Sequence, residues 1–170
     1  NYLRPPQTAA IVVCGTGYGG NREFAHKRIK EYGRFGTAFR FDHTFQDMSP
    51  AFRTTPMAHW FANLFTERNP MADADTIVRQ FHALTFATPE EVYDAIKAPM
   101  LVLTGSEDSA HPGSFALRDR VPGCELKVLP GAGHACQLEQ PWLFDKFMLD
   151  FLDRKGLFPG APKVLEPMTV

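Results

Sequence analysis

Short apolar runs alternate with longer amphipathic stretches along the chain, and this pattern predicts a parallel α/β sheet. The runs at residues 8–14, 100–104 and 125–129 are rich in aliphatic residues, and each is followed by glycine or proline, as buried strands often are. Stretches of helical character separate and follow them. Strands that alternate with helices are typical of a parallel sheet whose faces are covered by helices.

A helix with one apolar face is predicted in the C-terminal part of the chain, ending at Gly156. Its apolar residues recur at i, i+3, i+4, i+7 and i+8, which places them on one side of a helix; they are Phe144, Phe147, Met148, Phe151 and Leu152. Further helices are predicted over residues 22–32 and 73–86, and from the capping-box pattern of residues 88–91 onward.

The long segment between the first two strands predicts a separate helical layer. It contains no convincing strand and many aromatic residues, and an insertion above the carboxyl ends of parallel strands lies where ligands bind. We interpret residues 1–22 as a core strand and turn, 23–98 as a helical cap or lid, 99–158 as the remaining core and 159–170 as a surface tail. The aromatic residues would form the core of such a cap, and three are candidates for the substrate pocket: Trp60, Phe61 and Phe65.

The overall composition predicts one soluble globular domain. Charged residues make up 22% of the 170 residues and the net charge is −1, so the sequence shows no basic stripe for binding nucleic acid. The apolar runs are much shorter than the roughly 20 residues of a membrane span. The first residues lack the pattern of a signal peptide. We therefore expect a cytoplasmic protein without a nucleic-acid or membrane partner.

The three cysteines predict neither a zinc site nor a redox motif, because no C-x-x-C pair occurs among Cys14, Cys124 and Cys136. Few cysteines in an odd number fit a reducing compartment. Cys14 ends a predicted strand and is open to two interpretations, a reactive thiol or a buried core residue. Cys136 follows a histidine by two positions. Packing is the favoured interpretation for both.

A glycine-rich turn follows the first predicted strand, and Gly15, Gly17 and Gly20 have the G-x-G-x-x-G spacing of dinucleotide-binding turns. That fold also needs an acidic residue at the end of the next strand, ~20 residues further on. Asp42 is the nearest suitable residue, but a glycine-rich, helical stretch precedes it instead of a strand. A dinucleotide-binding module therefore stays the least favoured hypothesis.

Two loops carry the residue types of acid–base chemistry. Asp108 follows the strand at 100–104, and His134 follows the strand at 125–129. Adjacent parallel strands bring such loops side by side, so we expect the two side chains to form a hydrogen bond. A carboxylate in this place orients the imidazole and stabilises its charged form, while the imidazole transfers a proton. Glu107 is an alternative acid.

At these two loops the sequence resembles the carboxyl-terminal half of the α/β-hydrolase family. In that family one strand is followed by G-x-x-D-x-x-x-P and a later one by G-x-G-H, an acidic residue and a proline; the matching residues here are Gly105, Asp108, Pro112, Gly131, Gly133, His134, Glu139 and Pro141. The resemblance covers about residues 8–157. It implies that Asp108 is the triad acid and His134 the triad base, with no cofactor and no metal.

The family's nucleophile elbow, G-x-S-x-G, is missing from this sequence. None of the four serines has the flanking residues that the elbow needs; they are Ser49, Ser106, Ser109 and Ser114. In the family the elbow precedes the strand that begins here near Thr8. We therefore expect the nucleophile and oxyanion hole to come from a complementary amino-terminal part or partner fragment.

The resemblance implies a hydrolase that uses a nucleophile–His–Asp triad, usually with serine as the nucleophile, on an ester, thioester, amide or activated C–C bond. An aspartate nucleophile would instead imply dehalogenase or epoxide hydrolase chemistry, and the sequence does not separate these. The aromatic insertion favours a small apolar or aromatic substrate. The alternative from another class is a non-catalytic ligand-binding protein on the same fold.

Overall fold

The computed structural model describes residues 7–19, 22–68 and 73–158. The described elements, in chain order, are β1 (Ile11–Cys14), α1 (Arg22–Phe35), the 3-10 helix η2 (Gly36–Phe39), α2 (Arg40–Gln46), α3 (Pro50–Arg53), α4 (Pro56–Arg68), α5 (Ala74–Ala83), α6 (Glu90–Asp94), β2 (Met100–Gly105), α7 (His111–Arg120), β3 (Glu125–Leu129), α8 (Cys136–Glu139) and α9 (Pro141–Arg154). Gly20 of the glycine-rich pattern and the predicted tail lie outside the described residues.

The described strands form one parallel sheet in the order β1-β2-β3. β2 lies in the middle and all six of its residues are buried, whereas those of β1 are only partly buried. The pattern of short apolar runs therefore predicted the sheet correctly, and the second and third strands agree to within one residue. The first strand begins at Ile11, three residues later than predicted.

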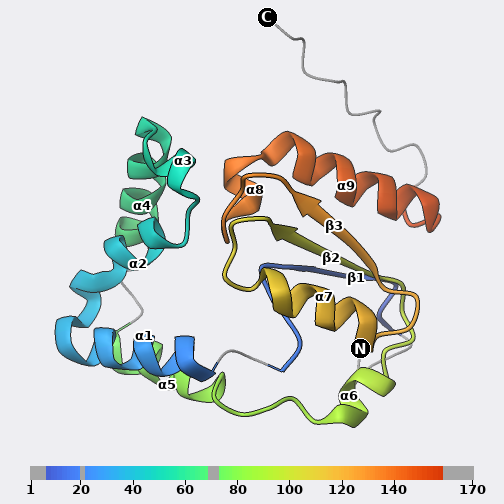
Figure 1. The fold of residues 1–170 in the computed structure, drawn as a ribbon, viewed down its shortest axis with the longest axis horizontal. Coiled ribbons are helices and arrows are strands. Elements are labelled where there is room, and N and C mark those ends of the chain that lie inside the picture. Colours follow the sequence, from blue (N-terminus) through green and yellow to red (C-terminus); the bar gives the residue numbers. More distant parts are fainter. Residues whose placement is uncertain (1–6, 20–21, 69–72, 159–170) are drawn as a thin grey trace, which may run out of the picture.

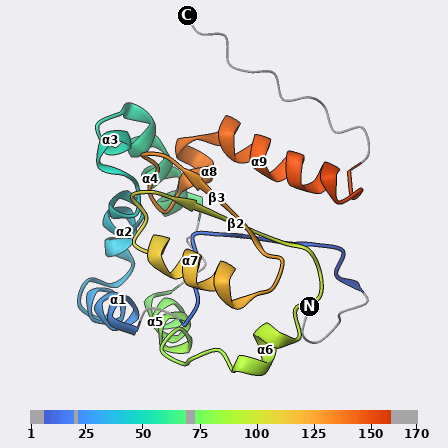
Figure 2. The same cartoon turned by 45° about the vertical axis from the view of Figure 1, so that its right-hand side comes forward.

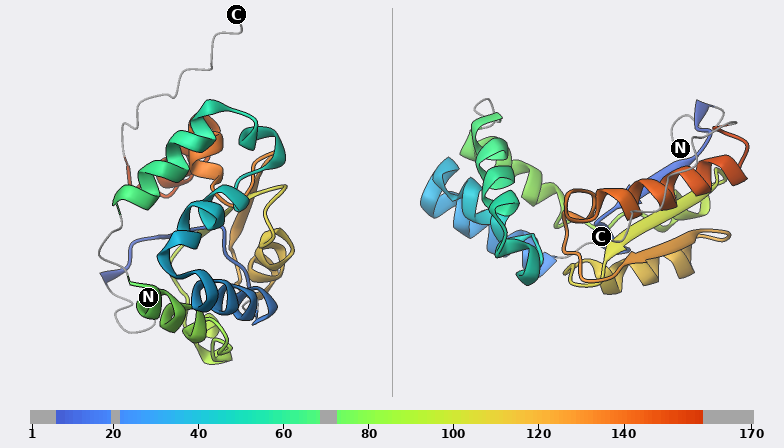
Figure 3. Two further views of the ribbon diagram at one scale, coloured as in Figure 1. Left: turned by 90° about the vertical axis from the view of Figure 1, so that its left-hand side faces the viewer. Right: turned by 90° about the horizontal axis from the view of Figure 1, so that it is seen from above.

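Helices cover both faces of the sheet, as Figures 1 and 3 show, with α9 on one side and α6 and α7 on the other. Alternate residues of β2 supply the two cores. Leu101 and Leu103 pack toward α9, while Met100 and Val102 pack toward α6 and α7. The two-residue period of a strand thus divides one apolar run between two layers.

The predicted apolar stripe of α9 is confirmed, because all five of its residues lie in the core on that side of the sheet. Phe151 is fully buried there. The helix ends at Arg154, and Gly156 follows with a φ of +68°, in the left-handed region that glycine adopts readily after a helix.

Helices α1 to α5 form a group of their own beyond the carboxyl ends of the strands (Figures 1 and 2). A small aromatic core holds α1, η2 and α5 together through Tyr32, Phe39 and Ile77. The ring of Tyr32 meets that of Phe39 edge to face at a centroid distance of 5.3 Å. Much of the aromatic content of this segment is therefore packing within the group.

The start of α6 differs from the capping-box prediction. Pro89 occupies the N-cap position without a side-chain hydrogen bond, and Thr88 precedes it. Long-range contacts hold this short helix instead, since Glu90 accepts hydrogen bonds from the Tyr18 hydroxyl at 2.5 Å and from Arg120 Nε at 2.8 Å.

None of the described helices has the length and apolar character that crossing a bilayer demands.

Phe151→Ala tests the packing of α9 against the sheet. The change removes a fully buried ring, and we expect it to lower the free energy of unfolding by roughly 3–5 kcal/mol, measured by urea denaturation. Phe86→Ala is the control, because that ring is 76% exposed and its loss should change stability by less than about 0.5 kcal/mol. Equal losses from both variants would contradict this packing.

Candidate active site

Asp108 is held in a tight turn directly after β2. Its backbone N–H donates to the Gly105 carbonyl at 3.3 Å, and its Oδ1 accepts a hydrogen bond from the Ala110 N–H at 2.8 Å. The side chain is almost wholly buried, with 1% of it exposed. The strand end and the turn therefore fix a carboxylate that has little freedom to turn away.

His134 meets this carboxylate from the loop after β3. Its Nδ1 lies 3.2 Å from both Oδ1 and Oδ2 of Asp108. The structure thus brings together the two residues that the sequence analysis selected. Glu107, the alternative acid, is exposed, and no hydrogen bond joins its side chain to His134 among the described residues.

The environment of His134 favours its charged form. The hydrogen bond to Asp108 raises the pKa of the imidazole, burial opposes this, and the negative charges of Asp108 and Asp47 add to the rise. About half of the side chain, 47%, remains exposed. The ring is therefore oriented by a buried carboxylate on one side and accessible on the other.

The glycine-rich turn after β1 lies against this imidazole ring. A Cβ on Gly15 would be 2.7 Å from His134 Cε1 and 2.8 Å from Nδ1, so only a glycine leaves room for the ring there. Asp42, the acidic residue considered for a dinucleotide, lies within α2 and does not follow a strand. The described part of the turn thus borders the histidine, and no strand leads to Asp42.

Main-chain contacts connect the helical group to the histidine loop. The backbone N–H of His134 donates to the Asp47 carbonyl at 2.8 Å. The Glu139 carboxylate accepts hydrogen bonds from the N–H groups of Ser49 and Gly133, with N···O distances of 3.1–3.2 Å. The segment between α2 and α3 is therefore attached directly to the loop that carries the imidazole.

Gly133 permits this close approach. A Cβ at this position would be 2.5 Å from the Ser49 nitrogen and 2.8 Å from the Asp47 oxygen, both of which are backbone atoms. Any side chain at residue 133 would push the two segments apart.

A charged network supports the same segment from the helical side. The Asp47 carboxylate pairs with Arg28 at 3.0 Å and with His43 at 3.2 Å, and His43 Nδ1 lies 2.8 Å from the Tyr32 hydroxyl. Burial works against ionisation of Asp47, but the hydrogen bond from His43 and the charges of His43 and Arg28 outweigh it and lower the pKa of this carboxyl. Asp47 is therefore held ionised near His134.

A cavity of about 230 Å³ adjoins His134. Its lining comes from both parts of the chain and mixes polar with apolar groups: Cys14, His43, Thr44, Asp47, Phe65, His134, Ala135, Gln137 and Leu138. Of the three predicted pocket residues, Phe65 contributes to this lining. Trp60 and Phe61 do not, and their rings pack against each other at 5.0 Å.

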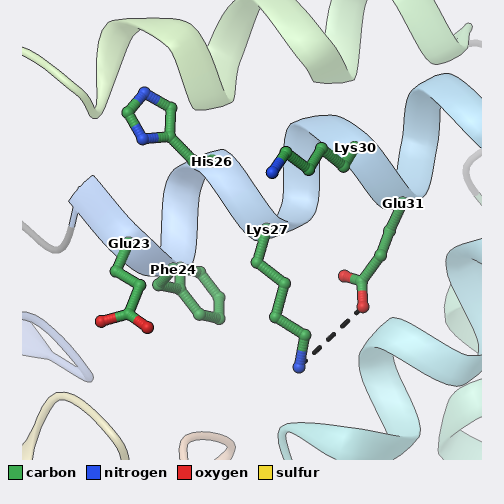
Figure 4. Close-up of a pocket in the computed structure, with 6 residues that line it drawn as sticks. All are labelled: Glu23, Phe24, His26, Lys27, Lys30 and Glu31. Atoms are coloured by element: carbon green, nitrogen blue, oxygen red, sulfur yellow. Dashed lines mark ion pairs between the residues drawn. The ribbon is translucent and has the colours of Figure 1, made fainter.

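A wider hollow of about 800 Å³ is lined by residues of α1 between Glu23 and Glu31, which Figure 4 shows. Charged and polar side chains dominate its lining, including the Lys27–Glu31 pair at 3.9 Å. It contains neither Asp108 nor His134, so the smaller cavity is the one that matters for chemistry at the imidazole. Across the described residues, no three potential ligands are grouped closely enough to hold a metal ion.

Three of the four serines have structural hydrogen bonds. Ser49 Oγ accepts from the Phe52 N–H at 3.2 Å as the N-cap of α3, and Ser106 Oγ accepts from the Gly131 N–H at 2.7 Å. Ser114 Oγ donates to the Thr16 carbonyl at 2.7 Å. None of these bonds involves His134.

Comparison with known proteins identifies the fold and the family. The model of the α/β-hydrolase family matches residues 3–143, which is most of the chain. The chain belongs to the α/β-hydrolase family. Its parallel sheet with flanking helices is accordingly that of an α/β hydrolase, as the resemblance predicted.

Relatives in this family include named hydrolases. The rat protein called "Putative protein-lysine deacylase ABHD14B" is 35% identical over 60 residues, which cover 35% of this chain and 29% of that protein. The Pseudomonas savastanoi protein called "Putative carbamate hydrolase RutD" is 31% identical over 81 residues, or 46% and 31% of the two chains. These matches thus span less than a third of each relative.

A solved structure shows the same fold. The enol-lactonase from Burkholderia xenovorans LB400 superimposes with a TM-score of 0.72 at 20% identity, covering 89% of this chain and 60% of that one. Nearly all of this chain therefore corresponds to part of a larger α/β-hydrolase structure.

The residues that hold the histidine loop against the helices were not predicted from the sequence. Glu139 was noted only as part of the family pattern, and Asp47 and Arg28 were not singled out. Ser49 followed by Pro50 is a local signal for a helix start that was not used for a prediction, and Ser49 is the N-cap of α3. No local signal points to the contact of Ser49 with Glu139, because the two residues are 90 positions apart.

Glu139→Ala tests the attachment of the helical group. It leaves the N–H groups of Ser49 and Gly133 without their acceptor, and we expect a loss of roughly 1–3 kcal/mol in the free energy of unfolding. Glu139→Gln keeps an acceptor oxygen and should lose less. The exposed Glu107→Ala is the control, and an equal loss there would contradict the role of Glu139.

The Asp108–His134 bond can be tested by NMR titration of the imidazole. The pKa of His134 should lie above ~6.5 in the native chain. Asp108→Asn removes the charge that stabilises the imidazolium, so this pKa should fall. The exposed Asp145→Asn should leave it unchanged. A His134 pKa that is insensitive to Asp108→Asn would show that the two side chains are not coupled.

Proposed function

We propose that this chain carries the acid–base half of a hydrolase active site. Asp108 orients His134, and His134 transfers protons for a nucleophile that lies outside these 170 residues. The Asp108–His134 hydrogen bond at the carboxyl edge of the sheet, beside a cavity, is the observation that carries this proposal. Membership in the α/β-hydrolase family and the hydrolase names of its relatives support it.

In this mechanism Asp108 accepts the Nδ1–H of His134, which leaves Nε2 to act as the base. Neutral Nε2 takes a proton from the nucleophile as that group attacks the substrate. The imidazolium that forms is stabilised by the buried Asp108 carboxylate. It then gives the proton to the leaving group, so that the same ring acts first as base and afterwards as acid.

The substrate class follows from the relatives and the cavity. The names of the deacylase, the carbamate hydrolase and the enol-lactonase all describe attack on an acyl carbon. A cavity of about 230 Å³ suits a small group, and Phe65 and Leu138 give it an apolar side. We therefore propose a small ester, thioester or amide with an apolar or aromatic group. The helical group α1–α5, which we propose acts as the cap, supplies part of the cavity wall.

The nucleophile would be contributed by an amino-terminal α/β-hydrolase part, as a preceding segment or a separate fragment. The edge strand β1 supports this proposal. Its residues are apolar yet only partly buried, and among the described residues it pairs with β2 alone. An apolar edge strand is a natural surface for a further strand.

Turnover by the protein assembled with that amino-terminal part tests the proposal. His134→Ala should lower kcat/KM on a panel of small esters by about a hundredfold or more, with ligand affinity retained, because the base is lost. The exposed His82→Ala is the control. Unchanged turnover in His134→Ala would overturn the mechanism, and ligand binding without turnover in the native protein would favour a binding protein.

The pH profile adds a second test. Because the base must be neutral, kcat/KM should rise with pH through the raised pKa of His134 and level off above it. Asp108→Asn should move this rise to lower pH while reducing the plateau. Imidazoles ordinarily titrate between about pH 5 and 8, and the pKa of His134 is raised, so a profile that is flat from about pH 5 to 9 would contradict its role.

A further inference from the structure

Two cysteines lie in contact at the same end of the sheet. Cys14 ends β1 and Cys136 begins α8, 122 positions later, yet their Sγ atoms are 3.3 Å apart. Cys14 is partly exposed and belongs to the lining of the cavity beside His134. Cys136 is fully buried in the core beneath it. One thiol is therefore open to small molecules and the other stands behind it.

The surroundings give the two thiols different chemical characters. The hydrogen bond from Cys136 and the charge of His134 lower the pKa of Cys14, although burial opposes this. The pKa of Cys136 is raised, because it shares that hydrogen bond and is buried. Thiolates and not thiols are nucleophiles, so Cys14 is the reactive member of the pair.

We propose that Cys14 and Cys136 form an oxidation site at which a small hydroperoxide, such as hydrogen peroxide, produces a reversible disulfide. The Cys14 thiolate attacks one peroxide oxygen, the O–O bond breaks, and the products are Cys14 sulfenic acid and, with one proton, water. Cys136 sulfur then attacks Cys14 sulfur. The S–S bond forms, the S–O bond breaks, and the hydroxyl leaves as water with the proton of Cys136.

In the balanced reaction two thiols and one hydrogen peroxide give one disulfide and two waters. Both sulfurs are oxidised and both peroxide oxygens are reduced. The Sγ atoms need to approach from 3.3 Å to a bond length of about 2.05 Å. This shift is small, and the cavity beside Cys14 gives the peroxide access to the first sulfur.

A disulfide here would join the two chain segments that lie next to the candidate catalytic imidazole of His134. Cys14 immediately precedes Gly15, which lies against the His134 ring, and Cys136 is two residues after His134. Drawing the sulfurs together would displace the surfaces that hold the ring. An effect on turnover rests on the proposed function, whereas the thiol chemistry itself does not.

Cys124 provides an internal control. It precedes β3 at the opposite, amino end of the sheet, and its Sγ lies 3.6 Å from the Glu125 carbonyl oxygen with no second thiol beside it. Burial raises its pKa to about 11. It therefore lacks both the reactivity and the partner of Cys14.

The experiment treats the reduced, folded protein, assembled with its amino-terminal part, with hydrogen peroxide; peptide mapping by mass spectrometry then counts the free thiols of this chain. We expect two of the three thiols to disappear, with Cys14 and Cys136 joined by a bond that a phosphine reductant reverses. Cys136→Ala should stop at a Cys14 sulfenic acid, trapped with dimedone. Cys124→Ala should leave the disulfide unchanged.

Three free thiols after treatment, over-oxidation of Cys14 without a crosslink, or a crosslink involving Cys124 would each overturn the proposal. The measurement on the unaltered chain is decisive even if Cys136→Ala fails to fold. The thiol measurement does not depend on turnover. Hydrolysis without a disulfide would overturn only the oxidation site, and a disulfide without hydrolysis would overturn only the proposed function.

Discussion

Parallel pairing of β2 with β3 is the constraint on which the candidate site depends. The register sets Leu103 opposite Lys127 and Gly105 opposite Leu129. Both strands therefore end at the carboxyl edge of the sheet, and the loops that follow them lie side by side. A slip by one residue would turn each side chain of one strand to the other face. Backbone hydrogen bonds within the buried centre of the molecule thus determine how far the Asp108 carboxylate lies from the imidazole of His134.

The imidazole loop is stabilised from the core and from the helical group together. The Asp108 side chain holds the imidazole ring of His134. The Asp47 carbonyl accepts a hydrogen bond from the backbone N–H of His134. Arg28 is only 3% exposed, and its charge balances the carboxylate of Asp47 close to the loop. An unpaired charge buried there would be costly, and the ion pair with Asp47 offsets part of that cost.

Local pattern and strand order were sufficient to predict the sheet, the stripe of α9 and the meeting of Asp108 with His134. Each follows from the period of an apolar run or from the rule that parallel strands end together. The contact of Ser49 with Glu139 follows from neither, because it joins the ends of separate elements through backbone atoms. The true start of α6 was missed for a similar reason, since its anchors Tyr18 and Arg120 are remote in sequence.

The bonds that join the helical group to the histidine loop use main-chain atoms on the helical side. The carbonyl of Asp47 and the N–H of Ser49 are present whatever side chains these positions carry, provided the backbone keeps its path. Side chains of the helical group that line the cavity, such as Phe65, can therefore change while these main-chain bonds stay in place. The attachment of the helices thus depends on the path of the backbone, whereas the make-up of the cavity wall depends on side chains.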